Sequence, residues 1–508
     1  MAVNQIKAGA ALNYVVLGLS NLVGLLYTPY MLRMMGQSEY GLYSLVGSVI
    51  AYLTILDFGF GNAIIRYTAK FRAEGRTQEQ YSMFGMFFVL YSLIGLIALA
   101  AGAGLYFNVE AIFGDTMSAE ELDKARILLI LMLFNLAFSF PMGIFGSIIT
   151  AYEDFIFQKA VQIARIVLNT AVMICLLHWG YRAIAMVVVQ TVFNVATLLL
   201  NWFYCRYKIK IKLVFGKFRW GFLKEIAIYS FWIFLNAIMD RIYWSTGQFV
   251  LGAVVGTAAV AVFAVAINLE SMYLGFSTAI SGVFLPKVTA MVATHKSDEE
   301  ISNLFIRTGR IQYIVMAFIL SGFILFGRQF INIWAGDGYE DAYIIALCFF
   351  IPLTVPLIQN MGITILQARN QMKFRSVTYV IIAVISLAAQ IPMAKYFGSI
   401  GCAAAIAAAL TLGQILIMNV YYYRKQNIDI PKFWYEIGKM SIVPIISVIV
   451  FGRILKSYPT DTLLSLCAGI TVYSAIYIPL FWIFGMNDDE KRLIGTPIKR
   501  LALKLCGK

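Results

Sequence analysis

Apolar runs of about 20 residues alternate with short polar segments along the whole chain. A helix rises about 1.5 Å per residue, so a run of this length can cross the roughly 30 Å hydrocarbon core of a bilayer. The pattern therefore predicts an all-α polytopic membrane protein with about fourteen spanning helices. The predicted spans are 10–32, 41–65, 81–107, 127–150, 160–179, 183–204, 226–251, 257–283, 311–327, 344–366, 377–394, 400–422, 437–455 and 463–486.

Composition supports the membrane assignment, because 61% of the residues are hydrophobic and only 13% are charged. A soluble protein of this length needs more charge on its surface. The net charge of +14 does not indicate nucleic-acid binding, because no basic cluster lies in a soluble domain. With the N-terminus inside, about four-fifths of the Lys and Arg residues fall on the cytoplasmic side. Both termini are therefore expected to be cytoplasmic.

The chain also resembles itself at an offset of about 215–220 residues. The clearest series keeps one offset of 218: Asn201, Tyr204 and Arg206 match Asn419, Tyr422 and Arg424. Each repeat holds six helices, an even number, so the two repeats must be parallel and related by an axis along the membrane normal. We predict an N-lobe over 1–215, a C-lobe over 216–430, and two further helices with a basic cytoplasmic tail over 431–508. A cleft between two such lobes is typical of transporters.

Four charged residues lie well inside the predicted spans: Asp57, Asp240, Arg241 and Glu270. A charge at the helix centre costs roughly 2.5–3.5 kcal/mol even on the lenient insertion scale, so such residues are usually functional. One hypothesis is that they line a water-filled cavity. The alternative is a closed ion pair in which Arg241 and Glu270 join two helices.

Three further polar residues enter this prediction. At an offset of 220, Arg241 aligns with Asn21 in the first span, so both are expected to face the cleft. Arg66 and Arg165 are predicted near the inner ends of their helices. For Arg165 the favoured interpretation is that the side chain reaches out to the headgroups. For Arg66 that interpretation and a role at the inner mouth of the cleft both stay open.

The second span ends in Leu-Asp-Phe-Gly-Phe-Gly-Asn over 56–62, where two glycines follow Asp57. This pattern predicts a bend or a close helix contact. No catalytic constellation occurs in the sequence: there is no P-loop, and the two histidines are far apart. An enzyme is therefore not expected, and no cofactor is predicted. Transport would be driven by an ion gradient, by the membrane potential or by another protein.

The segments GQSEYGLYSLVGS (36–48) and LDFGFGNAIIRY (56–67) resemble the first two helices of bacterial polysaccharide flippases. These proteins belong to the multidrug/oligosaccharidyl-lipid/polysaccharide (MOP) exporter superfamily. The helix-two arginines of the related lipid II flippases are missing here apart from Arg66. The resemblance implies a MATE- and flippase-like fold in the bacterial cytoplasmic membrane. It also implies a polysaccharide polymerase and export machinery as partners, besides membrane lipids.

The resemblance further implies movement of an isoprenoid-pyrophosphate-linked oligosaccharide from the inner to the outer leaflet. Arg241 and Arg66 would be the cationic partners of the pyrophosphate. The acids Asp57, Asp240 and Glu270 are equally suited to carrying a coupling H⁺ or Na⁺. The alternative is therefore a cation-coupled exporter of small amphipathic drugs. A membrane-bound polymerase or acyltransferase is disfavoured, because the loops are too short for a catalytic site.

Overall fold

The computed structural model describes residues 5–216, 220–281, 296–369, 371–457 and 462–493, together with residues 288, 291 and 294. The predicted basic tail after residue 493 lies outside the described residues. Within the described ranges the chain is almost entirely helical and contains no strand. The prediction of an all-α membrane protein is therefore confirmed.

The chain divides into two compact units. Unit 1 consists of Met1–Ala264 and Leu387–Cys402, and unit 2 of Val265–Ser386 and Ala403–Lys508. Two helices contribute to both units, α11 (Thr257–Ser281) and α16 (Met372–Leu410). The predicted division into two six-helix lobes and a two-helix extension stays a prediction.

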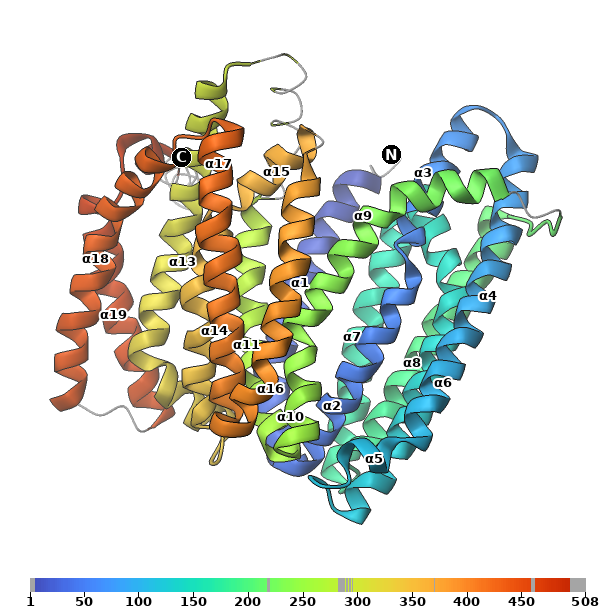
Figure 1. The fold of residues 1–508 in the computed structure, drawn as a ribbon, viewed down its shortest axis with the longest axis horizontal. Coiled ribbons are helices and arrows are strands. Elements are labelled where there is room, and N and C mark those ends of the chain that lie inside the picture. Colours follow the sequence, from blue (N-terminus) through green and yellow to red (C-terminus); the bar gives the residue numbers. More distant parts are fainter. Residues whose placement is uncertain are drawn as a thin grey trace, which may run out of the picture. The chain divides into compact units, whose positions relative to one another are not determined.

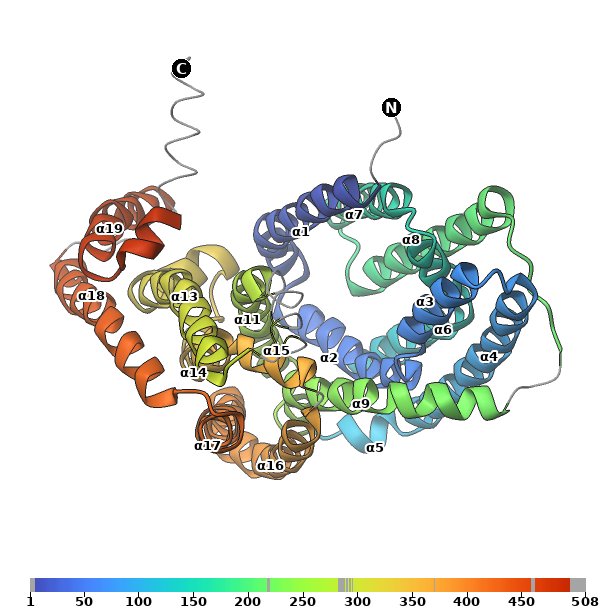
Figure 2. The ribbon, with the colours of Figure 1, turned by 90° about the horizontal axis from the view of Figure 1, so that it is seen from above.

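In unit 1, α6 lies at the centre and packs against α2, α3, α4 and α8, while α1 packs against α7 (Figures 1 and 2). Large apolar side chains such as Phe84, Phe87 and Ile148 fill the interior between these helices. The elements are α1 (Gln5–Met35), α2 (Gln37–Leu53), η1 (Thr54–Asp57), α3 (Phe60–Ala73), α4 (Thr77–Phe107), α5 (Val109–Phe113), α6 (Ala119–Ala151), α7 (Phe155–His178), α8 (Ala183–Tyr204), η2 (Cys205–Ile209), α9 (Trp220–Trp244) and α10 (Thr246–Val254).

In unit 2, the long helix α13 packs against α14, α18 and α19 (Figure 1). Buried aromatic side chains, among them Phe326, Tyr473 and Phe481, fill the space between α13, α18 and α19. The elements are α13 (Asp298–Ala335), α14 (Asp341–Ile358), α15 (Asn360–Ala368), η3 (Thr411–Ile417), α17 (Met418–Gln426), α18 (Ile430–Ser457) and α19 (Leu463–Phe484).

Twelve helices of the described part are long and apolar enough to cross a membrane. Two features separate this number from the predicted fourteen. The segment 372–426 covers two predicted spans as one candidate, although its backbone turns at Gly398 with φ 60°. The predicted span 226–251 is not among the twelve candidates, and α9 and α10 divide it at Ser245. The chain is thus a multi-pass membrane protein, and the number fourteen stays a prediction.

Candidate functional site

The second spanning segment breaks at the position where the sequence predicts a bend. Helix α2 passes into the 3₁₀ turn η1, and α3 begins only at Phe60. Between them, Phe58 and Gly59 both adopt the left-handed conformation, with φ 52° and 72°. Glycine takes up such a φ without steric cost, whereas phenylalanine does not. The Asp57 carboxylate at the end of η1 accepts a hydrogen bond of 2.6 Å from the Tyr91 hydroxyl of α4.

A second and slighter interruption, which the sequence did not predict, lies in the segment that carries Arg241: one residue, Ser245, separates two helices and keeps a right-handed helical conformation (φ −107°, ψ −28°). Helix α9 ends at Trp244 and α10 begins at Thr246, so Arg241 lies three residues before the end of α9. The sequence predicts Arg241 in the middle of one continuous helix. Its backbone carbonyl accepts hydrogen bonds from Ser245 N (2.9 Å) and Thr246 Oγ1 (3.5 Å). The guanidinium of Arg241, which is half-buried, donates a hydrogen bond of 3.3 Å to Thr54 Oγ1.

The two breaks lie against each other within unit 1. Besides the bond between Arg241 and Thr54, the Tyr52 hydroxyl is hydrogen-bonded to the Thr246 hydroxyl. The rings of Phe58 and Phe234 also lie 4.7 Å apart. We call these contacts the helix-break site, composed of Tyr52, Thr54, Asp57, Arg241 and Thr246. Broken helices at membrane depth are tolerated where they line a cavity or are buried in protein, and they form the binding sites of many transporters.

Arg241 is the cationic element of the helix-break site. Among the described residues the guanidinium has no carboxylate partner, and its hydrogen bond goes to the neutral hydroxyl of Thr54. Asp57 lies on the facing break and is bonded instead to Tyr91. Such a guanidinium keeps its positive charge, since an arginine side chain does not lose its proton in proteins. It can therefore hold an anion that reaches the break.

The remaining predicted site residues are distributed over both units. Asp240 and Asn21 have exposed side chains on α9 and α1. Arg66, on α3, is also exposed, and its guanidinium carbon lies 5.8 Å from the centre of the Tyr67 ring. Glu270 lies in the part of α11 that belongs to unit 2 and is only 3% exposed. Of the six predicted residues, Arg241 bonds to Thr54 of η1, and Asp57 lies at the end of the same turn with Tyr91 as its partner. The roles of all six stay predictions.

A polar pocket of about 320 Å³ lies elsewhere in unit 1, among α2, α6, α7 and α8. Arg165 lines this pocket. It lies ten residues beyond the first residue of α7, roughly 15 Å along the helix. The Arg165 side chain thus lies in the wall of a polar pocket, and its expected reach to the headgroups stays a prediction.

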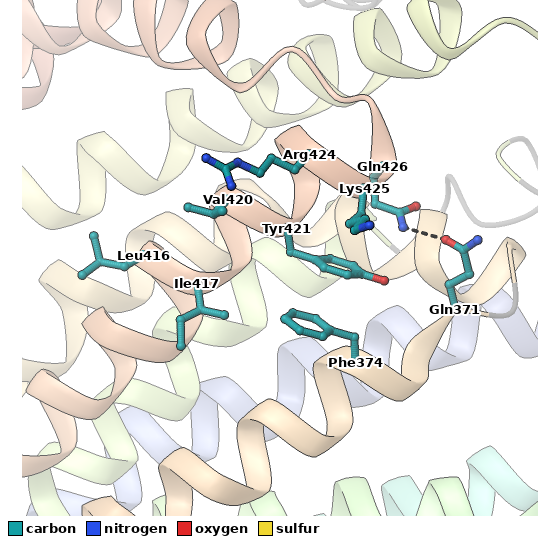
Figure 3. A pocket seen from close by; sticks show the side chains of 9 residues that line it. All are labelled: Gln371, Phe374, Leu416, Ile417, Val420, Tyr421, Arg424, Lys425 and Gln426. Atoms are coloured by element: carbon teal, nitrogen blue, oxygen red, sulfur yellow. Dashed lines mark hydrogen bonds between the residues drawn. The ribbon is translucent and has the colours of Figure 1, made fainter.

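Unit 2 contains a pocket of a different character, of about 680 Å³, beside α16 and α17 (Figure 3). Its wall is largely apolar, and the Tyr421 and Phe374 rings stack with centroids 4.1 Å apart. Arg424 and Lys425 are basic lining residues from the last turn of α17. Cations in this position are favourable with the helix dipole, and next to an apolar wall they suit an anionic lipid headgroup.

The sequence matches the family model described as polysaccharide biosynthesis protein over residues 6–292, which is more than half of the chain. The chain belongs to this polysaccharide biosynthesis protein family. The matched region contains the entire helix-break site and the Arg165 pocket. Among curated proteins no sequence matches the chain.

The fold of this family member is similar to that of several solved transporters. The inward closed conformation of the lipid II flippase MurJ is 17% identical with a TM-score of 0.68, covering 94% of this chain and 99% of its own. An inward-facing multidrug resistance MATE family transporter is 14% identical with a TM-score of 0.61, covering 81% and 99%. A MOP superfamily transporter from Pyrococcus furiosus is 13% identical with a TM-score of 0.56, covering 84% and 95%. At these identities the similarity establishes the fold.

Sequence reasoning missed two features of this family member. The interruption at Ser245 contains no proline, and the nearest glycine, Gly247, already lies inside α10. The pocket around Arg165 depends on residues from four helices that are far apart in the sequence. One available signal was the number of amide and hydroxyl side chains in otherwise apolar spans, such as Asn135, Gln190 and Asn194.

Proposed function

We propose that this polysaccharide biosynthesis protein is a flippase, which moves an isoprenoid-pyrophosphate-linked oligosaccharide from the inner to the outer leaflet of the bacterial cytoplasmic membrane. The observation that carries the proposal is the state of Arg241. Its guanidinium lies where the two interrupted segments meet and, among the described residues, donates its side-chain hydrogen bond to the neutral hydroxyl of Thr54. It can therefore hold a pyrophosphate while the apolar tail of the substrate stays in lipid.

Pyrophosphate suits this site chemically. The planar guanidinium presents a fork of donors that can bind two phosphate oxygens at once, and the bonds are charge-assisted. If the site opens alternately to the inner and the outer face of the membrane, the bound head group would cross with it. In this scheme both termini are cytoplasmic, and a polysaccharide polymerase would use the product at the outer face.

The acidic residues have a separate proposed role. Asp57 and Glu270 carry carboxylates in membrane-spanning helices, and they are the candidates for carrying a coupling H⁺ or Na⁺. Asp57 already accepts a hydrogen bond from Tyr91 at the break of the second span. Loading or unloading of a cation there could change the geometry of the break and thereby the access to Arg241. Within this proposal the protein transports and catalyses no covalent step.

The decisive experiment compares Arg241→Ala, Arg241→Lys and the wild type in proteoliposomes loaded with a lipid-linked oligosaccharide. Accessibility of the sugar to an external glycosidase or lectin measures leaflet-to-leaflet movement. A charge-assisted hydrogen bond contributes about 1.5–3 kcal/mol. Since about 1.4 kcal/mol corresponds to a factor of ten, we expect Arg241→Ala to slow movement roughly ten- to hundredfold. Arg241→Lys should restore part of the rate, because it keeps the charge and loses the fork.

Thr54→Val is the matched control, since it removes the hydroxyl partner of Arg241 and leaves the guanidinium in place. It should retain most of the transport. Full transport by a normally inserted Arg241→Ala protein would contradict the proposal. So would vigorous export of cationic dyes without movement of the lipid-linked sugar, which would favour the drug-exporter alternative.

A further inference from the structure

The polar pocket of unit 1 shares no residue with the helix-break site. Four helices, α2, α6, α7 and α8, contribute side chains to its wall, and the cavity measures about 320 Å³. At roughly 30 Å³ per water molecule, this space accommodates a small ligand together with water. Of the twelve residues that line it, Arg165 is the one with a charge.

The neutral polar groups of the pocket are bonded to one another. Asn194 Nδ2 donates to Asn135 Oδ1 at 2.5 Å and to Ser139 Oγ at 2.8 Å. Across the pocket, the Tyr43 hydroxyl donates to Gln190 Oε1 at 3.2 Å. These acceptor oxygens are thus already engaged. The network connects α6 with α8 and α2 with α8, so it fixes the shape of the wall before any ligand arrives.

Arg165 stands apart from this network. Among the described residues its guanidinium has neither a hydrogen-bond acceptor nor a carboxylate partner. It is half-buried in the wall of the pocket, roughly 15 Å along α7 from the first residue of that helix. Charged residues at such depth are costly and are usually matched by a partner or by a water-filled cavity. The described lining of the pocket contains no carboxylate. An anionic ligand could therefore pair with the Arg165 guanidinium.

We propose that this pocket is a binding site for a small oxyanion, a carboxylate or a phosphate, held by the guanidinium of Arg165. The planar fork of the guanidinium matches the two oxygens of either group. The rigid wall of amides and hydroxyls surrounds the anion with neutral polar groups, which do not repel it as a carboxylate would. This site is separate from the helix-break site, and the inference holds whether or not the protein moves a lipid-linked sugar.

The test measures binding to the full-length protein purified in detergent, using isothermal titration calorimetry. The probes are glucuronate for a carboxylate, inorganic phosphate for a phosphate, and glucose as the neutral control. We expect at least one of the two anions to bind and glucose not to bind. Arg165→Gln should weaken anion binding at least tenfold, whereas Arg241→Gln should leave this binding event in place. The stronger of the two anions then identifies the source of the oxyanion.

Arg165→Lys is the control for misfolding of Arg165→Gln, because it keeps the positive charge in the pocket. It should bind the same anion several-fold more weakly, since an ammonium lacks the fork. Equal affinity in the wild type and in Arg165→Gln would overturn the proposal, as would binding of neither anion or loss of binding only in Arg241→Gln. A loss of flipping with intact anion binding would count against the proposed function and not against this site.

Discussion

Two arginines, one in each unit, have opposite surroundings: Arg310 is buried and Arg165 is half-buried. Arg310 of α13 in unit 2 is 6% exposed and donates to two carboxylates. Its Nε and Nη2 lie 2.6 and 2.9 Å from Glu490, and its Nη1 lies 2.7 Å from Glu436. Arg165 of unit 1 lines a pocket of neutral polar groups and has no acidic partner among the described residues.

The difference teaches that burial of a charge does not by itself mark a binding site. Arg310 and its carboxylates connect α13 with α18 and with the segment that follows α19, so their role is to hold the last helices of unit 2 in place. Removing one member of such a group leaves another charge buried and unpaired. Arg165 holds no helices together in this way, since no described carboxylate pairs with its guanidinium. An arginine without a protein anion is available to a ligand.

The largest expected effect is on stability. Arg310→Ala should lower the free energy of unfolding by about 3–5 kcal/mol, because two carboxylates lose their cation. The matched variant Arg165→Ala should change it by less than about 1 kcal/mol, since no partner is left unsatisfied. Equilibrium unfolding of the purified proteins in mixed micelles measures both. Similar decreases in the free energy of unfolding of the two variants would contradict the difference between the two arginines.

A smaller effect separates the two acids that surround Arg310. The Glu490 side chain is 3% exposed and accepts two hydrogen bonds from Arg310 and one from Asn487 N. The Glu436 side chain is 27% exposed and accepts one hydrogen bond from Arg310. Glu490→Gln should therefore cost about 1.5–3 kcal/mol of unfolding free energy. Glu436→Gln should cost less than about 1 kcal/mol, because water screens a partly exposed pair. The same unfolding experiment ranks them, and the reverse order would show that Glu436 is the main partner.

The smallest effect is expected at an exposed arginine. Arg424 lies in the last turn of α17 beside the apolar pocket of unit 2 (Figure 3). Arg424→Gln removes only a favourable charge at the end of a helix, worth about 0.3–1 kcal/mol. Added salt should reduce this difference further by screening. A loss as large as that of Arg310→Ala would mean that Arg424 has a buried acidic partner.

Much of this protein is determined by its sequence. The thickness of a bilayer sets the length of an apolar run, so the membrane class and most spans follow from the chain itself. The bend after Asp57 was also predictable, since Gly59 can adopt a positive φ at no steric cost. The motif at 56–67 further pointed to the family that the residues 6–292 match. These are local properties, and each depends on residues that are close together in the sequence.

Only the tertiary structure decided which charges have partners. Arg310 and Glu490 are 180 residues apart in the sequence, and neither residue indicates the other. The pocket of Arg165 likewise needs four helices to meet around one side chain. Arg241 bonds to Thr54, which is 187 residues away in the sequence, and no local sequence pattern predicts this contact. Electrostatic free energy depends on the distance between charges and on their solvent, and both are properties of the packed helices.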